Sequence, residues 1–128
     1  MQPLVLIVDD DINFREIWKI KLSNSGFNVL TASNGKEALE ILKNNKPNII
    51  LLDIVMPEMD GIETFLNIKD NPELNSIKVF FITSLDDLNA ELANYHKQIA
   101  IDLGAAEFLR KATDLNELVD ILNKSINF

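Results

Sequence analysis

The run Leu4-Val5-Leu6-Ile7-Val8-Asp9-Asp10-Asp11 decides the fold of this chain. Five apolar residues without polar alternation are typical of a strand that is buried on both faces of a parallel sheet. A second run, Ile49-Ile50-Leu51-Leu52, leads in the same way into Asp53. Because open parallel sheets bind ligands at the carboxyl ends of their strands, we expect Asp9, Asp10 and Asp53 to share one edge.

Carboxylates crowded at one edge repel one another unless a cation neutralises them. The repulsion between two of them amounts to roughly 1–4 kcal/mol at about 4 Å, depending on the local dielectric. Carboxylate oxygens are preferred ligands of hard divalent cations such as Mg²⁺. The pattern therefore predicts a magnesium site built from Asp9, Asp10 and Asp53, with Mn²⁺ as a substitute ion.

The composition is that of one domain, which we expect to span residues 1–128. With 47% hydrophobic residues the chain is able to bury a proper core, and it contains no cysteine for disulfides, thiolate metal sites or nucleophiles. Its net charge of −8 argues against direct binding to nucleic acid. The first apolar run is too short for a signal peptide or a membrane span, so we expect a cytoplasmic protein.

Strand and helix patterns alternate along the whole chain. The expected strands are residues 4–8, 27–32, 48–53, 78–83 and 106–110. The expected helices are residues 12–24 (ended by Gly26), 36–44, one that begins near Gly61 with Asp60 as its cap, one that follows Asp86-Asp87, and one from Asp114. Five such units predict an α/β fold with a single doubly wound sheet and right-handed crossovers.

Apolar residues at helical spacing predict which helix faces are buried. The expected inward residues are Phe14, Ile17, Trp18 and Leu22 in the first helix, Ala38, Ile41 and Leu42 in the second, and Ile62, Phe65 and Leu66 in the third.

Two further polar features follow strands, namely Thr83-Ser84 after the fourth and Lys111 after the fifth. In phosphoryl transfer one carboxylate accepts the phosphoryl group and others hold Mg²⁺, which offsets its charge. A hydroxyl and an ammonium bind phosphate oxygens. Each signal alone is weak, because acidic pairs often cap helices and a lone lysine is usually a surface residue. Their joint placement in strand order predicts a phosphoryl-transfer site.

Four motifs resemble those of the response-regulator receiver family (CheY-like), the phospho-accepting domains of two-component signalling. They are Leu6-Ile7-Val8-Asp9-Asp10-Asp11, Leu51-Leu52-Asp53-Ile54-Val55-Met56-Pro57-Glu58-Met59-Asp60-Gly61, Phe81-Ile82-Thr83-Ser84, and Gly104-Ala105 ahead of Phe108 and Lys111. The similarity covers essentially the full chain and implies a flavodoxin-like sheet with strand order 2-1-3-4-5.

The resemblance also implies roles for individual residues. Asp53 matches the phospho-acceptor. Asp10 matches a direct Mg²⁺ ligand, Asp9 a ligand acting through water, and the Val55 carbonyl a backbone ligand. Thr83 matches the hydroxyl that moves to bind the phosphoryl group, Lys111 the lysine that pairs with it, and Phe108 the aromatic switch residue.

The resemblance further implies partners and an output. A histidine kinase or histidine phosphotransfer protein donates from phosphohistidine, and the chain is a signalling phospho-acceptor that assists its own phosphorylation and dephosphorylation rather than an enzyme. Family members use the helix 4–strand 5–helix 5 face for partners and dimerisation. Because no DNA-binding or catalytic motif is present, we expect a stand-alone receiver with a protein-contact output, unless the chain is a receiver module excised from a longer protein.

The sequence departs from the family pattern in two places, directly after Lys111 and between Thr83 and Lys111. Ala112 follows Lys111 where the family usually has proline after a cis bond, so we expect a trans or a strained cis bond and a less certain reach of Lys111. Thr83 and Lys111 are also 28 positions apart, which is more than a helical turn beyond the family's usual spacing. We expect the extra residues to lengthen the predicted fourth helix or the loop before it.

Two other classes stay open at this point. A haloacid dehalogenase-type phosphohydrolase also uses aspartate and Mg²⁺, but Asn13 stands where Thr or Val is expected, and 128 residues leave no room for a cap domain. A phosphorylation-independent receiver-like binding module is the other alternative, and Ala112 keeps it open. A dinucleotide or flavin protein is disfavoured because no glycine loop follows the first strand.

Overall fold

The computed structural model describes residues 2–54, 56, 59–83, 98, 101–104 and 107–126. The strands are β1 (Leu4–Val8), β2 (Asn28–Ala32), β3 (Ile49–Asp53), β4 (Lys78–Thr83) and β5 (Glu107–Arg110). The described helices are α1 (Ile12–Asn24), α2 (Gly35–Ile41), α3 (Gly61–Asp70) and α5 (Leu115–Ile126). The helix predicted after Asp86-Asp87 lies almost entirely outside the described residues.

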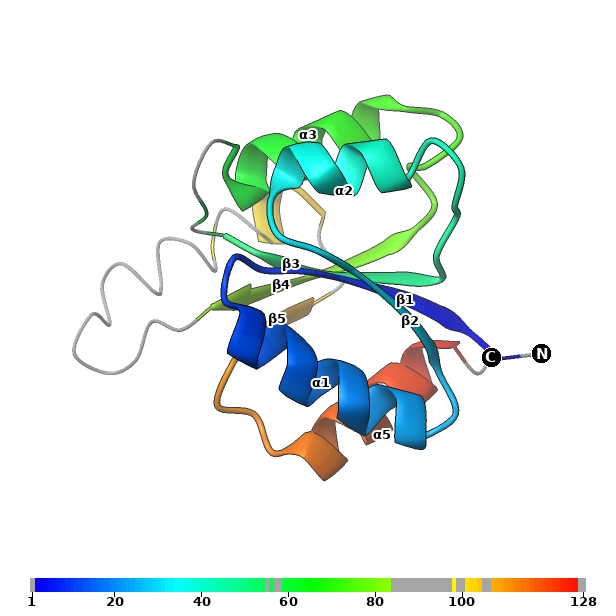
Figure 1. The fold of residues 1–128 in the computed structure, drawn as a ribbon. Coiled ribbons are helices and arrows are strands. Elements are labelled where there is room, and N and C mark those ends of the chain that lie inside the picture. Colours follow the sequence, from blue (N-terminus) through cyan, green and yellow to red (C-terminus); the bar gives the residue numbers. More distant parts are fainter. Residues whose placement is uncertain are drawn as a thin grey trace.

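The strands form one parallel sheet in the order β2-β1-β3-β4-β5. Helices α1 and α5 cover one face of this sheet, and α2 and α3 cover the other (Figure 1). The predicted α/β class, the doubly wound sheet and the strand order are confirmed. Since all the strands run in the same direction, their carboxyl ends meet at a single edge.

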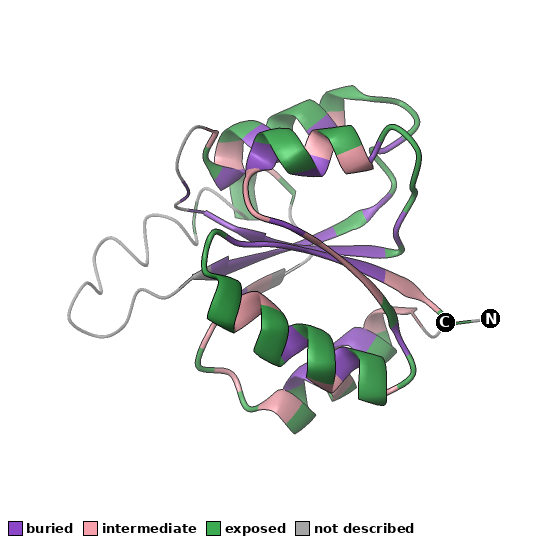
Figure 2. Ribbon diagram, in the orientation of Figure 1, coloured by how far each residue is buried: buried purple, intermediate pink, exposed green. Residues whose placement is uncertain are grey.

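The central strands are buried on both faces, which explains their lack of polar alternation (Figure 2). Successive residues of a strand point to opposite faces. Leu6 and Val8 therefore join the cluster under α2 and α3, whereas Val5 and Ile7 join the cluster under α1 and α5. Full burial of each such side chain stabilises the fold by about 1.5–3 kcal/mol.

The inward face of α1 is narrower than predicted. Trp18 and Leu22 are buried, and Phe14 packs against the same cluster, so the inward residues are spaced four apart. Ile17 is 54% exposed, and its predicted place on this stripe is wrong. A residue three positions after Phe14 lies on the flank of a stripe whose members recur every four residues.

The inward face of α3 is rotated toward α2 relative to the prediction. Leu66 is 44% exposed rather than inward, while Phe65 and the small residue Thr64 are fully buried. A Cβ atom added to Gly35 of α2 would lie 2.1 Å from Thr64 Oγ1. The close approach of the two helices at this point therefore brings Thr64, and not Leu66, to the interior.

Local hydrogen bonds set the helix ends. Asp60 Oδ1 accepts the Glu63 N–H and caps α3 as predicted. Asp11 caps α1 in the same way, a role that was not assigned to it from the sequence. Gly26, with a φ of 97°, follows the end of α1 as predicted, and this left-handed conformation favours glycine.

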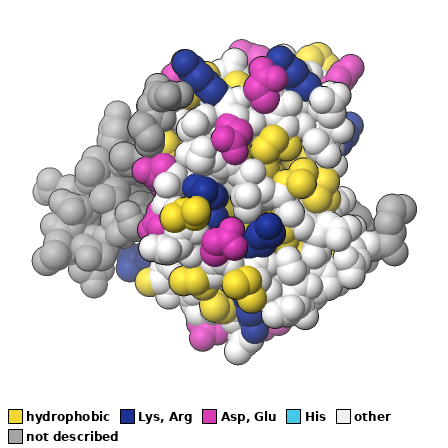
Figure 3. Space-filling model, viewed as in Figure 1, with side chains coloured by type: hydrophobic (Ala, Val, Ile, Leu, Met, Phe, Trp, Pro, Cys, Tyr) yellow, Lys and Arg dark blue, Asp and Glu magenta, His cyan; other side chains and the backbone are white. Residues whose placement is uncertain are grey.

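The visible surface over α1 carries hydrophobic side chains among charged ones (Figure 3). On that face the Lys and Arg side chains are interspersed with Asp and Glu, and no continuous basic surface is seen among the described residues (Figure 3). None of the helices in the described part of the chain has the length and apolar content needed to cross a membrane.

Candidate functional site at the carboxyl edge of the sheet

Neighbouring strands bring the acidic residues together. Asp9 follows β1 directly and Asp53 ends β3, and these two strands are paired with Val8 opposite Leu52. Carboxylate oxygens of Asp9, Asp10 and Asp53 lie within 4.8 Å of one another. The three carboxylates therefore share one edge of the sheet, as expected from the strand ends.

Asp9 and Asp53 are both removed from water, whereas Asp10 is exposed. Burial is the largest cause that raises the pKa of Asp53, from 3.8 to about 7, and the negative charge of Asp9 adds to it. Burial also raises the pKa of Asp9, although Lys111 and the backbone N–H of Asp11 oppose the shift. Negative charge on these two carboxyl groups is therefore disfavoured at this edge.

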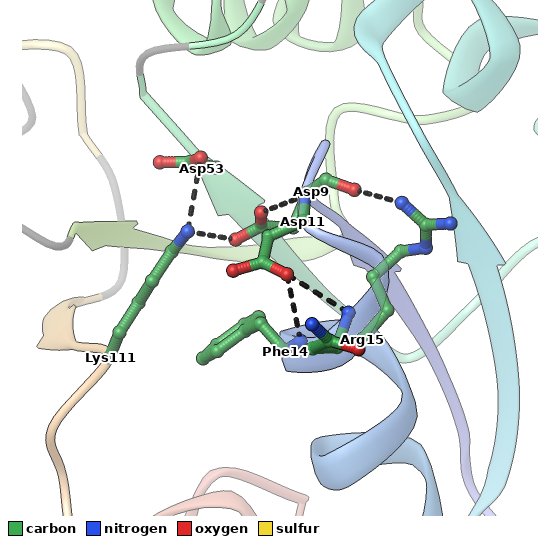
Figure 4. A network of polar contacts seen from close by, with 7 residues as sticks. Asp9, Asp11, Phe14, Arg15, Asp53 and Lys111 are labelled. Atoms are coloured by element: carbon green, nitrogen blue, oxygen red, sulfur yellow. Dashed lines mark hydrogen bonds and ion pairs between the residues drawn. The ribbon is translucent and has the colours of Figure 1, made fainter.

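Lys111 supplies one positive charge to the edge. Its ammonium lies 2.6 Å from Asp9 Oδ2 and 3.4 Å from Asp53 Oδ2 (Figure 4). Burial lowers the pKa of Lys111, but the two carboxylates outweigh it and the net shift is upward, so the ammonium stays charged. The Lys111–Ala112 peptide bond is trans, and Lys111 reaches Asp53 despite the missing proline.

The donor set fits a hard divalent cation. Three carboxylates face a single ammonium, which leaves an excess of negative charge among these groups. Asp9 Oδ2 is buried and, within the described residues, has the ammonium of Lys111 at 2.6 Å as its polar contact. Mg²⁺ or Mn²⁺ would find only oxygen ligands here, which both ions prefer. The Val55 carbonyl lies outside the described residues.

The cap of α1 and two residues of its first turn support the site, and none of the three was assigned to it from the sequence. Asp11 donates its N–H to Asp9 Oδ1 at 2.8 Å. Arg15 Nη1 donates to the Asp9 carbonyl at 2.6 Å (Figure 4). The Phe14 ring centroid lies 4.8 Å from Lys111 Nζ. The signal in the sequence was the position of these residues at the end of the acidic run and in the helix that follows it.

Gly61 allows α3 to begin against the end of β3. A Cβ atom at this position would lie 2.1 Å from the Asp53 carbonyl oxygen and 2.8 Å from Ile54 Cα. The Gly61 N–H also donates to the Ile54 carbonyl at 2.8 Å. Glycine is therefore required by close backbone packing beside Asp53.

The remaining predicted residues lie on β4 and β5. Thr83 ends β4 and is paired with Arg110, while its side chain lies outside what the structure describes. Phe108 is paired with Phe81, is partly buried and packs against the core under α2 and α3. The sheet register thus places both residues near the carboxyl edge, one and two strands away from Asp53.

The fold and the site together define a class: an open parallel α/β domain with clustered carboxylates and a lysine at the carboxyl edge of its sheet. Within that class, the chain belongs to the response regulator receiver domain family, whose sequence profile matches residues 5–123. Receiver domains of this family act in two-component systems as signalling phospho-acceptors. This membership favours the receiver over the phosphohydrolase alternative.

Individual relatives agree with this assignment. The transcriptional regulatory protein CrdR of Helicobacter pylori is 41% identical over 99% of this chain and 56% of its own length. The DNA-binding transcriptional regulator NtrC of Escherichia coli is 32% identical over 97% of this chain and 25% of its own length. The chain thus spans about half or less of the length of the curated relatives it matches.

Solved structures show the same fold. The chemotaxis response regulator CheY4 of Vibrio cholerae superposes with a TM-score of 0.86 at 25% identity, covering 98% of this chain and 100% of that one. The signal receiver domain of a histidine kinase from Syntrophus aciditrophicus gives a TM-score of 0.83 at 28% identity, covering 97% and 89%.

Proposed function

We propose that residues 1–128 form a receiver domain in which Asp53 accepts a phosphoryl group from the phosphohistidine of a histidine kinase or histidine phosphotransfer protein. The proposal is carried by the environment of Asp53. Its carboxylate is buried, its pKa is raised, and the ammonium of Lys111 lies 3.4 Å away. Asp9 is less suited to be the acceptor, because its side chain is fully buried and held by Lys111 at 2.6 Å.

The proposed transfer is a nucleophilic displacement at phosphorus. A carboxylate oxygen of Asp53 forms the new O–P bond while the N–P bond to the donor histidine breaks, and the electron pair of that bond stays on the imidazole nitrogen. Lys111 then pairs with the phosphoryl oxygens in a charge-assisted contact. Thr83 is proposed to bind the same oxygens through its hydroxyl.

The residues proposed to hold the metal are Asp10, Asp53 and the Val55 carbonyl directly, and Asp9 through water. Mg²⁺, or Mn²⁺ in its place, would offset the negative charge that the phosphoryl group brings to this edge. The fit rests on the oxygen-only donor set and on the excess of carboxylates over ammonium groups in this cluster.

The proposed output is a change of protein contacts. Phosphorylation gives Asp53 additional negative charge and new acceptor oxygens, which favour the conformation that Thr83 and Lys111 bind best. Phe108 is proposed to change its position together with this conformational change. The helix 4–strand 5–helix 5 face is proposed to bind a protein partner or a second copy of the chain. The position of Phe108 on β5, partly buried beside Phe81, supports its inclusion.

Acetyl phosphate with and without Mg²⁺, followed by intact-protein mass measurement, tests the proposal. We expect uptake of one phosphate that needs the metal and is absent in Asp53→Asn, while Asp70→Asn, at the exposed end of α3, behaves as wild type. Labelling at another residue would refute the role of Asp53. Sustained turnover of phosphate esters would favour the phosphohydrolase, and no uptake would favour the phosphorylation-independent module.

A further inference from the structure

We propose that Phe14 is a positioning residue for Lys111, whose ammonium it holds beside the carboxylates through the face of its ring. The role rests on the phospho-acceptor function proposed above and adds to it a residue from α1. Lys111 Nζ lies 4.8 Å from the Phe14 ring centroid, within the range of a cation–π contact. The side chain of Lys111 is only 17% exposed, so this contact is poorly screened by water.

The backbone around Lys111 does not by itself fix the ammonium. The turn after β5 is closed by the N–H and the hydroxyl of Thr113, which both donate to the Arg110 carbonyl. Beyond that turn the lysine side chain still has four rotatable bonds, and Ala112 adds no proline ring to stiffen the chain. The direction of the side chain must therefore come from what it contacts.

The charge that Lys111 meets on its two carboxylate partners changes during the proposed function. Asp53 gains negative charge when it is phosphorylated, as proposed above, and Asp9 belongs to the group of carboxylates that would share a cation. The Phe14 ring keeps the same electron distribution in all of these states. It is therefore able to hold the ammonium in place while the charges of the carboxylates change.

The ring is itself held by its packing, and its backbone is held by the helix cap. It lies against the Trp18 ring, with centroids 4.4 Å apart and planes tilted by 42°, and Trp18 is only 2% exposed. The Phe14 N–H donates to Asp11 Oδ1, the cap of α1. Core packing and helix capping thus fix the ring on the side of the ammonium where Figure 4 shows it.

A series of substitutions at Phe14 separates the effect of the aromatic ring face on Lys111 from the effect of apolar packing. Phe14→Leu keeps an apolar side chain but removes the π face, whereas Phe14→Tyr keeps both. We expect the rate of phosphate uptake from acetyl phosphate in Mg²⁺ to fall by about 5- to 30-fold in Phe14→Leu and to stay near wild type in Phe14→Tyr. Mono-, di- and trifluorinated phenylalanine at this position should lower the rate step by step, because fluorine weakens the negative ring face.

Two controls address stability and coupling. Phe27→Leu alters the same core cluster at the other end of the sheet, beside the start of β2, and should destabilise the fold without slowing uptake. In the Lys111→Met background, Phe14→Leu should cause no further loss of rate, since the partner of the ring is gone. Equal losses in Phe14→Leu and Phe14→Tyr, or an additive loss with Lys111→Met, would overturn the positioning role.

A measurement that needs no phosphorylation tests the contact itself. In the metal-free protein the ring current of Phe14 should shift the Hε protons of Lys111 upfield in NMR spectra, with Lys111→Met used for assignment. The shift should persist in Asp53→Asn and vanish in Phe14→Leu. Its absence from wild type, or its loss in Asp53→Asn, overturns this inference even if Asp53 is phosphorylated. Failure of wild type to take up phosphate refutes the function of Asp53 and leaves this measurement to decide the contact.

Discussion

Replacing Asp53 with asparagine should stabilise the metal-free protein at pH 8. Asp53 is buried to 5% exposure, and its pKa is raised from 3.8 to about 7, first by burial and then by the charge of Asp9. The charged form is therefore disfavoured in the folded state. Asparagine has nearly the same shape and carries no charge, so Asp53→Asn removes this penalty.

The sign follows from the protons that each state binds. Between pH 4 and pH 7 the folded protein keeps a proton on Asp53 that the unfolded chain, with a pKa of 3.8, has already lost. The stability of wild type therefore falls as the pH rises through this window and levels off above about pH 7. A shift of about 3 units at about 1.4 kcal/mol per unit gives an upper bound near 4 kcal/mol. We expect Asp53→Asn to gain about 2–4 kcal/mol at pH 8 and close to nothing at pH 4.

Urea unfolding with a chelator present measures the gain, with the fluorescence of Trp18, the one tryptophan in the chain, as the probe. Asp120→Asn, at an exposed position of α5, is the matched control and should change stability by less than about 0.5 kcal/mol. A destabilised Asp53→Asn at pH 8, or an equal gain at both pH values, would refute the description of Asp53 as a strained buried charge.

Three further outcomes are expected. Lys111→Met should destabilise the metal-free protein by about 3 kcal/mol in urea unfolding, because the fully buried Asp9 loses its ionic partner at 2.6 Å; an unchanged midpoint would contradict this. Gly61→Ala should lower the free energy of unfolding by about 1–3 kcal/mol and slow phosphate uptake, since its Cβ would meet the Asp53 carbonyl. The control Gly26→Ala has open space around it, so it should lower the free energy of unfolding by about 1 kcal/mol from its positive φ alone and leave uptake unchanged. Mg²⁺ binding near pH 7 should release a proton from Asp53, which calorimetry in buffers of different ionisation enthalpy detects; a heat independent of the buffer would exclude it.

The strands were predictable because their apolar runs are uninterrupted and end at charged or polar residues. Both β1 and β4 agree with the predicted bounds, β2 and β3 begin one residue later than predicted, and the predicted start of β5 at residue 106 lies outside the described residues. Helix α2 was harder: it was expected over residues 36–44 but spans Gly35–Ile41. Its last turns tighten, with the Lys43 N–H bonded to the Glu40 carbonyl, and no glycine or proline in the sequence marks this change.

The acidic part of the site was predictable for the same reason as the strands. Asp9 and Asp53 extend two paired strands, so parallel pairing alone places their carboxylates side by side. The faces of helices were less predictable, as Ile17 and Leu66 show, because packing against a neighbouring element decides which flank is buried. The capping role of Asp11 was not assigned, although an aspartate directly before the predicted start of a helix is a favoured cap.

The reach of Lys111 depended on information that the local sequence does not contain. The alanine after it left the direction of the chain open, and the structure resolves this with a trans bond and an ammonium that meets two carboxylates. A lysine stem is long and flexible, so its endpoint is set by distant contacts more than by the next peptide bond. Those contacts come from the residue after β1, from the end of β3 and from α1, which are far from Lys111 in the sequence. Where a receiver lacks the proline, the residue to compare is therefore the one at position 14, on the helix that faces the lysine.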